Sequence, residues 1–480
     1  MASPLPTPVV TDDGDMYASA AKIYPHEVDG RFQRLRKAAL FWLLGMFYVV
    51  PWLSWDGRQA VLFDLPARQF HILGLTFWPQ DFIYLSMLLM MAAFSLFFFT
   101  ALAGRLWCGY ACPQTVWTET FLWIERWTEG TRNQRMKLDA APMSWDKFRR
   151  KAGKQALWIA FAAWTGFTFV GFFTPIRELG ASILSFQVGP WEGFWMLFYG
   201  GATYGNAGYL REQVCKYMCP YARFQGAMFD RNTLVISYDA ARGEPRGARR
   251  KSADPKALGL GDCTDCTVCV QVCPTGIDIR NGLQYECIAC GACVDACDAV
   301  MDKMGYARGL VRYSTQNAIE GKPSRVLRPR IFVYSAILLA LAVGFSVSLA
   351  SRVPLIVDVL RDRNALYRET SAGIENAYTL KVMNKDGHEH HYEIAVESPV
   401  PLSISTPSGA HHDDDEDDDG GHRRRLRHFE VDAQHLRELP LTLTAAPGTA
   451  RGRIDVVFVV TNETDRGVSY RQKSAFFAPP

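Results

Sequence analysis

Eight cysteines in two runs of identical spacing constrain this chain more than any other feature. Each run has the pattern C-x2-C-x2-C-x3-C, and thirteen residues separate Cys273 from Cys287. A cubane iron–sulfur cluster takes three thiolates from one tight loop and a fourth from a distance, and in two-cluster proteins the fourth cysteine of each run binds the other cluster. The spacing therefore predicts two [4Fe-4S] clusters. The first quartet is Cys263, Cys266, Cys269 and Cys297, and the second quartet is Cys287, Cys290, Cys293 and Cys273.

Two other interpretations of these cysteines fit the pattern less well. Zinc sites usually combine two CxxC pairs, and disulfides need an oxidising compartment. The first run ends in Cys273-Pro274, whereas the second ends in Cys297-Asp298, a departure that removes no ligand. Over residues 261–302 the chain resembles the bacterial-type ferredoxin family.

Long apolar, aromatic-rich blocks alternate with polar segments along the chain. A helix needs about 20 apolar residues to cross a bilayer. One such block would also fit a buried core helix of a soluble protein, but five in one chain favour an α-helical membrane domain with about five transmembrane helices. The blocks are residues 37–55, 82–104, 155–173, 191–210 and 331–351, the first four of which form a predicted membrane domain at 37–210.

Basic residues between these blocks alternate in number, which predicts the orientation of the chain in a membrane. Five lysines and arginines lie in the first 37 residues, ten in residues 105–154 and eighteen in 211–330, but only two in 56–81 and one in 174–190. We therefore expect a multi-pass protein of a bacterial inner membrane with its basic segments in the cytoplasm. The N-terminal segment lacks the features of a secretory signal peptide.

The distribution of cysteines supports the same orientation. All twelve cysteines precede residue 298, and free thiols are typical of a reducing compartment. We expect the N-terminal segment 1–36 and the segment 211–330, with its ferredoxin module, to be cytoplasmic. Residues 352–480 are then periplasmic.

The C-terminal segment alternates apolar and polar residues with a period of two. YTLKVMN and HYEIAVES flank a Lys-Asp-Gly turn, which predicts a β-hairpin, and RIDVVFVVTNE and VSYRQKSAFF predict two further strands. Short strands at this spacing favour a small β-sandwich. Residues 411–428 contain too few apolar side chains to pack, so we expect a mobile loop there.

Four further cysteines form an internal repeat with the pattern C-x-Y-x-C-P, which we call the CP motifs. Cys108 and Cys112 lie in the first copy, and Cys215 and Cys219 in the second. Each motif follows an apolar block, so two related hairpins could bring four thiols together. Soft sulfur ligands suit Cu(I), zinc or a further iron cluster, and an unmetallated pair could act as a redox dithiol. Cysteines that merely fill helix contacts are the structural alternative, but a repeated pattern favours function.

Apolar blocks with CGYACPQTVWTE, a second CP motif, a two-cluster ferredoxin segment and a C-terminal β-domain together resemble the FixG/CcoG family of accessory proteins for cbb-type cytochrome c oxidase. The resemblance covers nearly the whole chain, and residues 108–117 are its most specific part. It implies an immunoglobulin-like C-terminal domain and reduction of Cu(II) to Cu(I) for delivery to the oxidase. The implied partners are oxidase assembly factors and a copper transporter or chaperone.

Histidines are concentrated in the C-terminal segment, where eight of the ten lie. Imidazole and carboxylate groups bind Cu(II), so copper capture by this segment is a hypothesis, although charged runs are usually solvated loops. The acidic run 413–419 lies among these candidates and is not part of the family pattern. The candidate ligands are His388, His390 and His391, with His411, His412 and His422.

The sequence thus predicts a membrane iron–sulfur protein that receives electrons from an unidentified cytoplasmic donor and reduces copper at the four CP-motif thiols. A quinol dehydrogenase subunit is one alternative, although the apolar blocks contain no histidine. A non-catalytic assembly scaffold is another. We find no Ser/His/Asp set, phosphate-binding loop or nucleic-acid-binding motif. The expected partners include membrane lipid, and whether the chain forms a homo-oligomer stays open.

Overall fold

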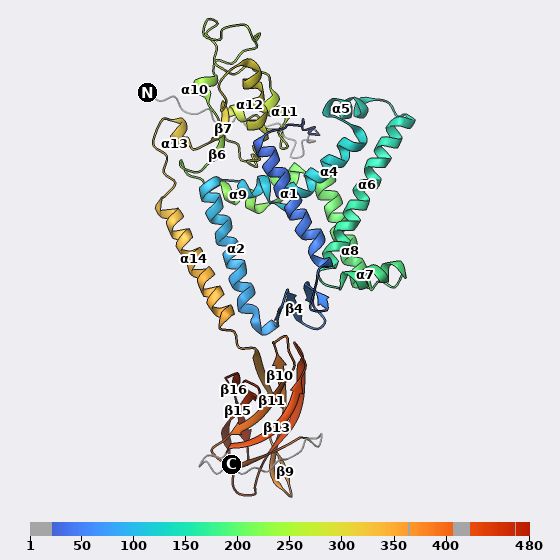
Figure 1. Cartoon of the computed structure of the whole chain (residues 1–480), viewed down its shortest axis with the longest axis vertical. Coiled ribbons are helices and arrows are strands. Elements are labelled where there is room, and N and C mark those ends of the chain that lie inside the picture. The colour runs from blue at the N-terminus through green and yellow to red at the C-terminus, as the bar shows by residue number, and fades with distance from the viewer. Residues whose placement is uncertain (1–21, 363–364, 407–422, 466) are drawn as a thin grey trace. The chain divides into compact units, whose positions relative to one another are not determined.

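The computed structural model describes residues 22–480 except 363–364, 407–422 and 466 (Figure 1). The chain divides into two compact units. The first unit combines the described residues up to Val50 with Ala92–Gly171 and Glu178–Leu338, and the second combines Pro51–Met91, Phe172–Arg177 and Leu339–Pro480.

Two helices among the described residues are long and apolar enough to cross a membrane. They are α2 (Phe82–Ala103), which a short 3-10 turn at Pro79–Asp81 precedes, and α14 (Pro329–Ala350). Each has a mean hydropathy of 2.2 over its most apolar window, of which only 6% is buried. Apolar surface exposed on this scale is unfavourable in water, so both helices suit a lipid environment. They correspond to the predicted spans 82–104 and 331–351.

The other three predicted spans also form helices, but they do not meet the same length and hydropathy criterion. Helix α1 (Arg31–Val49) begins with basic residues, and α6 (Trp145–Val170) starts ten residues before the predicted span, in a basic stretch. Helix α8 (Pro190–Thr203) is short and continues as a π-helix, η3 (Tyr204–Leu210). A domain of five membrane helices therefore stays a prediction.

Helices α4 (Pro113–Glu129), α6 and α8 pack together in the first unit. Small residues allow the close approach: a Cβ atom added at Gly166 of α6 would lie 2.3 Å from the carbonyl oxygen of Met196 in α8. Where α4 meets α6, Phe121 and Trp158 are fully buried, and the Trp158 indole donates to the Phe121 carbonyl. This packing places the start of α4, and with it the first CP motif, beside η3.

The predicted ferredoxin module lies in the first unit. It contains the short helix α11 (Val268–Gln271) and the longer α12 (Ala292–Met304). Two short strands, β6 (Val235–Tyr238) and β7 (Val311–Ser314), pair antiparallel beside the module. These strands were not predicted, because each has only four residues.

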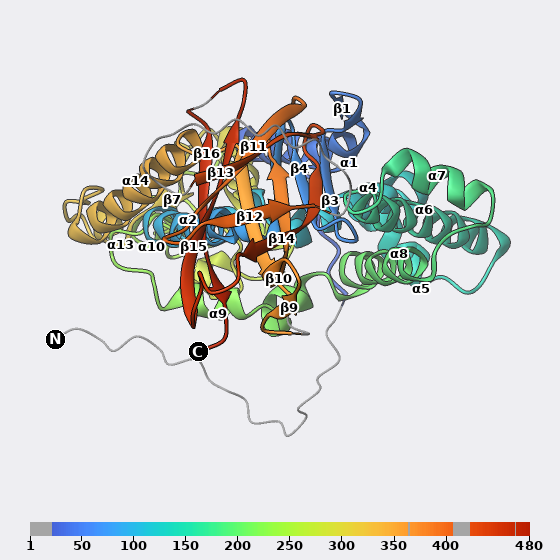
Figure 2. The ribbon, with the colours of Figure 1, turned by 90° about the horizontal axis from the view of Figure 1, so that it is seen from below.

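The C-terminal domain in the second unit is a sandwich of two antiparallel sheets, shown from below in Figure 2. One sheet has the order β12-β14-β10-β8, with β9 paired to β10, and the other has the order β13-β11-β15-β16. The strands are β8 (Leu355–Arg361), β9 (Arg368–Thr370), β10 (Gly373–Asn384), β11 (His390–Glu397), β12 (Leu402–Ser405), β13 (Arg423–Val431), β14 (Leu436–Ala445), β15 (Arg453–Asn462) and β16 (Ser469–Phe477).

Two predictions about this domain are wrong. The segments YTLKVMN and HYEIAVES lie in β10 and β11, which belong to different sheets and so do not form a hairpin. A period of two is the same for strands that pair and for strands that face each other across a core. Residues 423–428 of the predicted loop 411–428 are strand instead, because β13 begins at Arg423 and pairs with β11, while 411–422 lie outside the described residues.

A smaller sheet in the second unit lies between the first two predicted spans, in a segment for which no strand was predicted. Strands β3 (Val61–Asp64), β4 (Gln69–Ile72) and β5 (Leu75–Phe77) form an antiparallel meander. The Thr76 hydroxyl donates to the Gln434 side chain at 2.6 Å, and Asp81 pairs with Arg352 at 2.9 Å and Lys385 at 2.7 Å. These contacts attach the meander and the start of α2 to the sandwich within this unit.

Candidate metal centres

Two small cavities in the ferredoxin module are each lined by one predicted cysteine quartet. The cavity of the first quartet has a volume of about 20 Å³, with Tyr238 and Arg280 also on its wall. The cavity of the second quartet has a similar volume, about 20 Å³, and Cys269 of the first quartet also reaches it. All eight cysteines are free thiols. Four sulfur donors around each of two neighbouring cavities suit iron–sulfur clusters.

Local backbone geometry wraps the chain around these cavities. Asp265, Thr267 and Ala289 adopt left-handed conformations with φ of 51–56°, and Gly291 has φ of 77°. Such conformations are costly for residues other than glycine and concentrate at functional sites. A Cβ atom at Gly291 would also lie 2.7 Å from Cβ of Phe32. Glycine is therefore required there both for its backbone conformation and for lack of space.

Thiols in each quartet lie in apolar surroundings that disfavour the charged form, among them Cys269 and Cys297 of the first and Cys287 of the second. Burial raises the pKa of Cys269 to about 11, and it raises the pKa of Cys287 and Cys297 to about 12. A thiol in such a site becomes a thiolate at neutral pH only when a metal cation supplies the compensating charge. The quartets therefore fit metal-bound ligands.

Each CP motif forms a break between two helical segments. Cys108 lies in the short helix α3 (Leu106–Tyr110), and Cys112 precedes Pro113 at the start of α4. Cys215 lies in the π-helix η4 (Val214–Met218), and Cys219 precedes Pro220 at the start of α9 (Pro220–Gly226). Proline favours the first position of a helix, where its missing N–H costs nothing. A new helix therefore begins at each of these prolines.

Side chains outside the motifs join the two copies. The Cys108 thiol contacts the fully buried Gln225 of α9, with 3.6 Å between Sγ and Oε1. Gln114 donates to the carbonyl oxygens of Asn206 at 2.8 Å and Arg211 at 3.0 Å, just before the second motif. These glutamines were not identified from the sequence, because glutamine at such positions carries no recognisable signal.

The four CP-motif thiols lie in one region, but their sulfur atoms are too far apart to bind a single ion. Burial raises the pKa of Cys108 to about 12 and of Cys215 to about 11, and neighbouring CP-motif thiols add to both shifts. In the described part of the chain, however, no three of these sulfurs lie within 4.8 Å of one another. Sulfur ligands of one tetrahedral ion lie about 3.8 Å apart for Zn–S bonds of about 2.3 Å. A single ion would therefore draw the thiols inward.

The first CP motif packs directly on the loop of the second quartet. A Cβ atom at Gly109 would lie 2.8 Å from the carbonyl oxygens of both Ile288 and Ala289. Cys108 packs against the apolar cluster that contains Ile288 and Cys290. The Tyr313 hydroxyl donates to the Ala289 carbonyl at 2.6 Å and lies 3.3 Å from the Tyr110 hydroxyl. The first CP motif and the loop of the second quartet are thus packed directly against each other.

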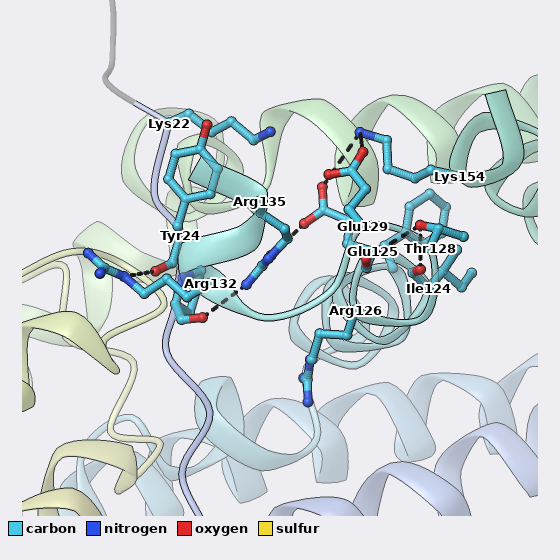
Figure 3. Close-up of polar contacts among 12 residues, drawn as sticks. Lys22, Tyr24, Ile124, Glu125, Arg126, Thr128, Glu129, Arg132, Arg135 and Lys154 are labelled. Atoms are coloured by element: carbon cyan, nitrogen blue, oxygen red, sulfur yellow. Dashed lines mark hydrogen bonds and ion pairs between the residues drawn. The ribbon is translucent and has the colours of Figure 1, made fainter. Parts of the chain in front are cut away.

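A network of buried charges supports this arrangement (Figure 3). Glu125 of α4 pairs with Arg211, which leads into the second CP motif, at 2.6 Å and with Arg135 at 2.8 Å. Lys154 of α6 pairs with Glu129 at 3.0 Å. Because these side chains are nearly inaccessible to water, each charge depends on its partner.

Among the described residues of the C-terminal domain, no candidate histidine belongs to a group of three possible metal ligands. His390 pairs with Asp386 at 2.7 Å, and the exposed His388 lies 3.8 Å from the same carboxylate. His411, His412 and His422 lie outside the described residues, as does the acidic run 413–419. Three exposed carboxylates, those of Glu389, Glu430 and Asp432, have oxygens within 4.8 Å of one another, which is common on protein surfaces without a bound metal.

These features define an iron–sulfur protein with two apolar helices suited to a membrane and an immunoglobulin-like C-terminal domain. Residues 84–130 match a family described as a 4Fe-4S binding domain, and residues 210–316 match a 4Fe-4S dicluster domain. Residues 345–479 match the IG-like fold at the C-terminus of FixG.

The chain belongs to the FixG family, as predicted. It is 40% identical to the nitrogen fixation protein FixG of Rhizobium meliloti, over 80% of each chain. It is also 40% identical to protein RdxB of Cereibacter sphaeroides, over 82% of this chain and 86% of that protein. A crystal structure of a FixG-related protein from Vibrio parahaemolyticus aligns with 26% of this chain and 95% of its own at 24% identity, with a TM-score of 0.21.

Proposed function

We propose that this protein is a membrane oxidoreductase that reduces Cu(II) to Cu(I) at the CP-motif thiols. The contact between the first CP motif and the loop of the second quartet carries the proposal, because it places cysteines of both kinds in one packed cluster. When bound, [4Fe-4S] clusters supply one-electron transfer. Cys263, Cys266, Cys269 and Cys297 would hold one cluster, and Cys273, Cys287, Cys290 and Cys293 the other.

The CP-motif thiols bind the substrate ion and favour its reduced form. Cu(II) takes up one electron and becomes Cu(I), which thiolates prefer because it is the softer ion. The electron comes from a cytoplasmic donor, and Cu(I) passes to copper carriers that serve assembly of a cbb-type oxidase. We also propose that the chain crosses the membrane with five helices. The ferredoxin module then lies in the cytoplasm and the C-terminal domain in the periplasm.

Replacement of Cys108, Cys112, Cys215 and Cys219 by serine tests this function. The purified, chemically reduced protein is mixed with Cu(II), and Cu(I) is followed with a colorimetric chelator. We expect the variant to keep its iron and lose copper reduction, while a control variant with His388 and His390 replaced by glutamine keeps both. Copper reduction at the native rate by an iron-replete four-serine variant would contradict the proposal.

A further inference from the structure

Arg105, between α2 and α3, is a buried cation without a carboxylate partner. Its side chain is only 4% exposed, and it donates a hydrogen bond to the carbonyl oxygen of Ala222 in α9. No carboxylate in the described part of the chain forms an ion pair with it. The guanidinium stays charged at any physiological pH, so this site keeps a full positive charge away from water.

The other buried cations show how unusual this is. Arg36 pairs with Glu119, Arg135 and Arg211 pair with Glu125, Lys154 pairs with Glu129, and Lys385 pairs with Asp81. Among the buried arginines and lysines of the described residues, Arg105 alone lacks such a partner. An uncompensated buried charge is strongly destabilising. A different anion should therefore face Arg105.

Cysteines of both CP motifs and of the second quartet lie around Arg105. Its main-chain carbonyl accepts a hydrogen bond at 3.2 Å from Gly109, the residue after Cys108. Its side chain bonds Ala222 in α9, the helix that Cys219 precedes. Gly109 in turn packs on the carbonyl oxygen of Ile288, the residue after Cys287.

We propose that Arg105 is the shared counter-ion of metal-bound thiolates in the CP motifs and the second quartet. The inference rests on the proposed ligand roles of these cysteines. Each electron that arrives adds one negative charge to this region, and a fixed cation stabilises the added charge without transfer of a proton. Arg105 therefore raises the reduction potential of the second-quartet centre and keeps the electron beside the CP motifs.

Arg105→Gln removes the charge, and Arg105→Lys keeps it. Arg328→Gln is a matched control, because Arg328 also donates to a main-chain carbonyl, that of Ala101, but pairs with Asp230. Potentials are measured by electron paramagnetic resonance during redox titration of anaerobically purified, full-length protein, with iron content determined in parallel. We expect Arg105→Gln to lower one of two midpoint potentials by about 59 mV, a tenfold loss of electron affinity for one electron.

The other midpoint potential, that of the first-quartet centre, should stay unchanged, as should both potentials in Arg105→Lys and Arg328→Gln. Unchanged potentials in an iron-replete Arg105→Gln protein would overturn the inference. Equal shifts in Arg105→Gln and Arg105→Lys would also overturn it, because the cause would then be the hydrogen bond to Ala222 rather than the charge. Copper reduction by the four-serine variant, with a shifted potential in Arg105→Gln, would reject the proposed copper site and leave the role of Arg105 standing.

Discussion

Individual buried side chains decide how the two CP motifs are held together. Glu125 compensates two arginines, one of which precedes the second motif, and lies in the helix that starts at the first. Loss of this one carboxylate would leave two guanidinium groups without an anion. The cost of breaking a buried pair in this way exceeds the value of an exposed pair several-fold.

Glu125→Gln should therefore destabilise the protein by about 3–5 kcal/mol. The measurement is thermal or denaturant unfolding of the detergent-purified protein, followed by tryptophan fluorescence. Arg150→Gln is the control, because its pair with Asp146 is exposed and is worth at most about 0.5 kcal/mol. Similar losses of stability in the two variants would show that the buried ion pairs of Glu125 contribute no more to stability than an exposed pair does.

A second residue-scale prediction concerns pH. Burial lowers the pKa of His71 to about 4, with a smaller contribution from Arg58, and its ring lies 2.9 Å from the Thr76 hydroxyl that bonds Gln434. The unfolded chain, with a histidine pKa of about 6.5, binds the proton more readily than the folded one. Stability from neutral His71 is thus complete above pH 6.5 and is lost as pH falls toward 4.

Hydrogen exchange of the meander at pH 7 and pH 4.5 checks this prediction. We expect faster exchange at pH 4.5, after correction for intrinsic rates, in the native protein. In His71→Gln, the exchange rates at pH 7 and pH 4.5 should differ less than in the native protein. If pH changed the exchange rates equally in both proteins, titratable groups other than His71 would be the cause.

At the scale of elements, helix α3 lies against the ferredoxin loop because one residue has no side chain. A methyl group at Gly109 would meet two backbone carbonyl oxygens, neither of which can rotate away. Gly109→Ala should therefore cost about 1–3 kcal/mol through overpacking and should slow copper reduction, because α3 and the loop must separate.

Gly153→Ala is the matched control, since a Cβ atom added at Gly153 of α6 would meet no atom within 4 Å. That change should be neutral or should stabilise α6 by up to about 1 kcal/mol. Stopped-flow measurement of Cu(I) formation by reduced, iron-replete protein compares the two. A native rate in Gly109→Ala would show that this contact does not govern electron delivery.

At the scale of the whole molecule, the proposed orientation places every native cysteine on one side of the membrane. Thr464 in the C-terminal domain and Ser252 before the ferredoxin module are both exposed. Thr464→Cys should react with an impermeant maleimide in intact spheroplasts, whereas Ser252→Cys should react only after permeabilisation. The native chain is the background control. The reverse labelling pattern would show that the chain has the opposite orientation in the membrane.

The cysteine quartets could be predicted from the sequence because a cluster-binding loop is built from about a dozen consecutive residues, so ligand spacing is a local property. The two apolar helices were predictable for a similar reason, since hydropathy is a sum over neighbours. Four strands of the C-terminal domain, β10, β11, β15 and β16, were predicted from their period, but the sheets to which they belong were not. Facing and paired strands share the same alternation, which is why β10 and β11 were wrongly joined in a hairpin.

The tertiary structure alone decided which distant residues meet at the candidate site. Arg105 and Gln225 have no motif of their own, and they matter because helix packing buries Arg105 against α9 and Gln225 against Cys108. A sequence records the charge of an arginine but not whether a carboxylate faces it after folding. Compensation of a buried charge depends on contacts in space, and only the folded chain determines these.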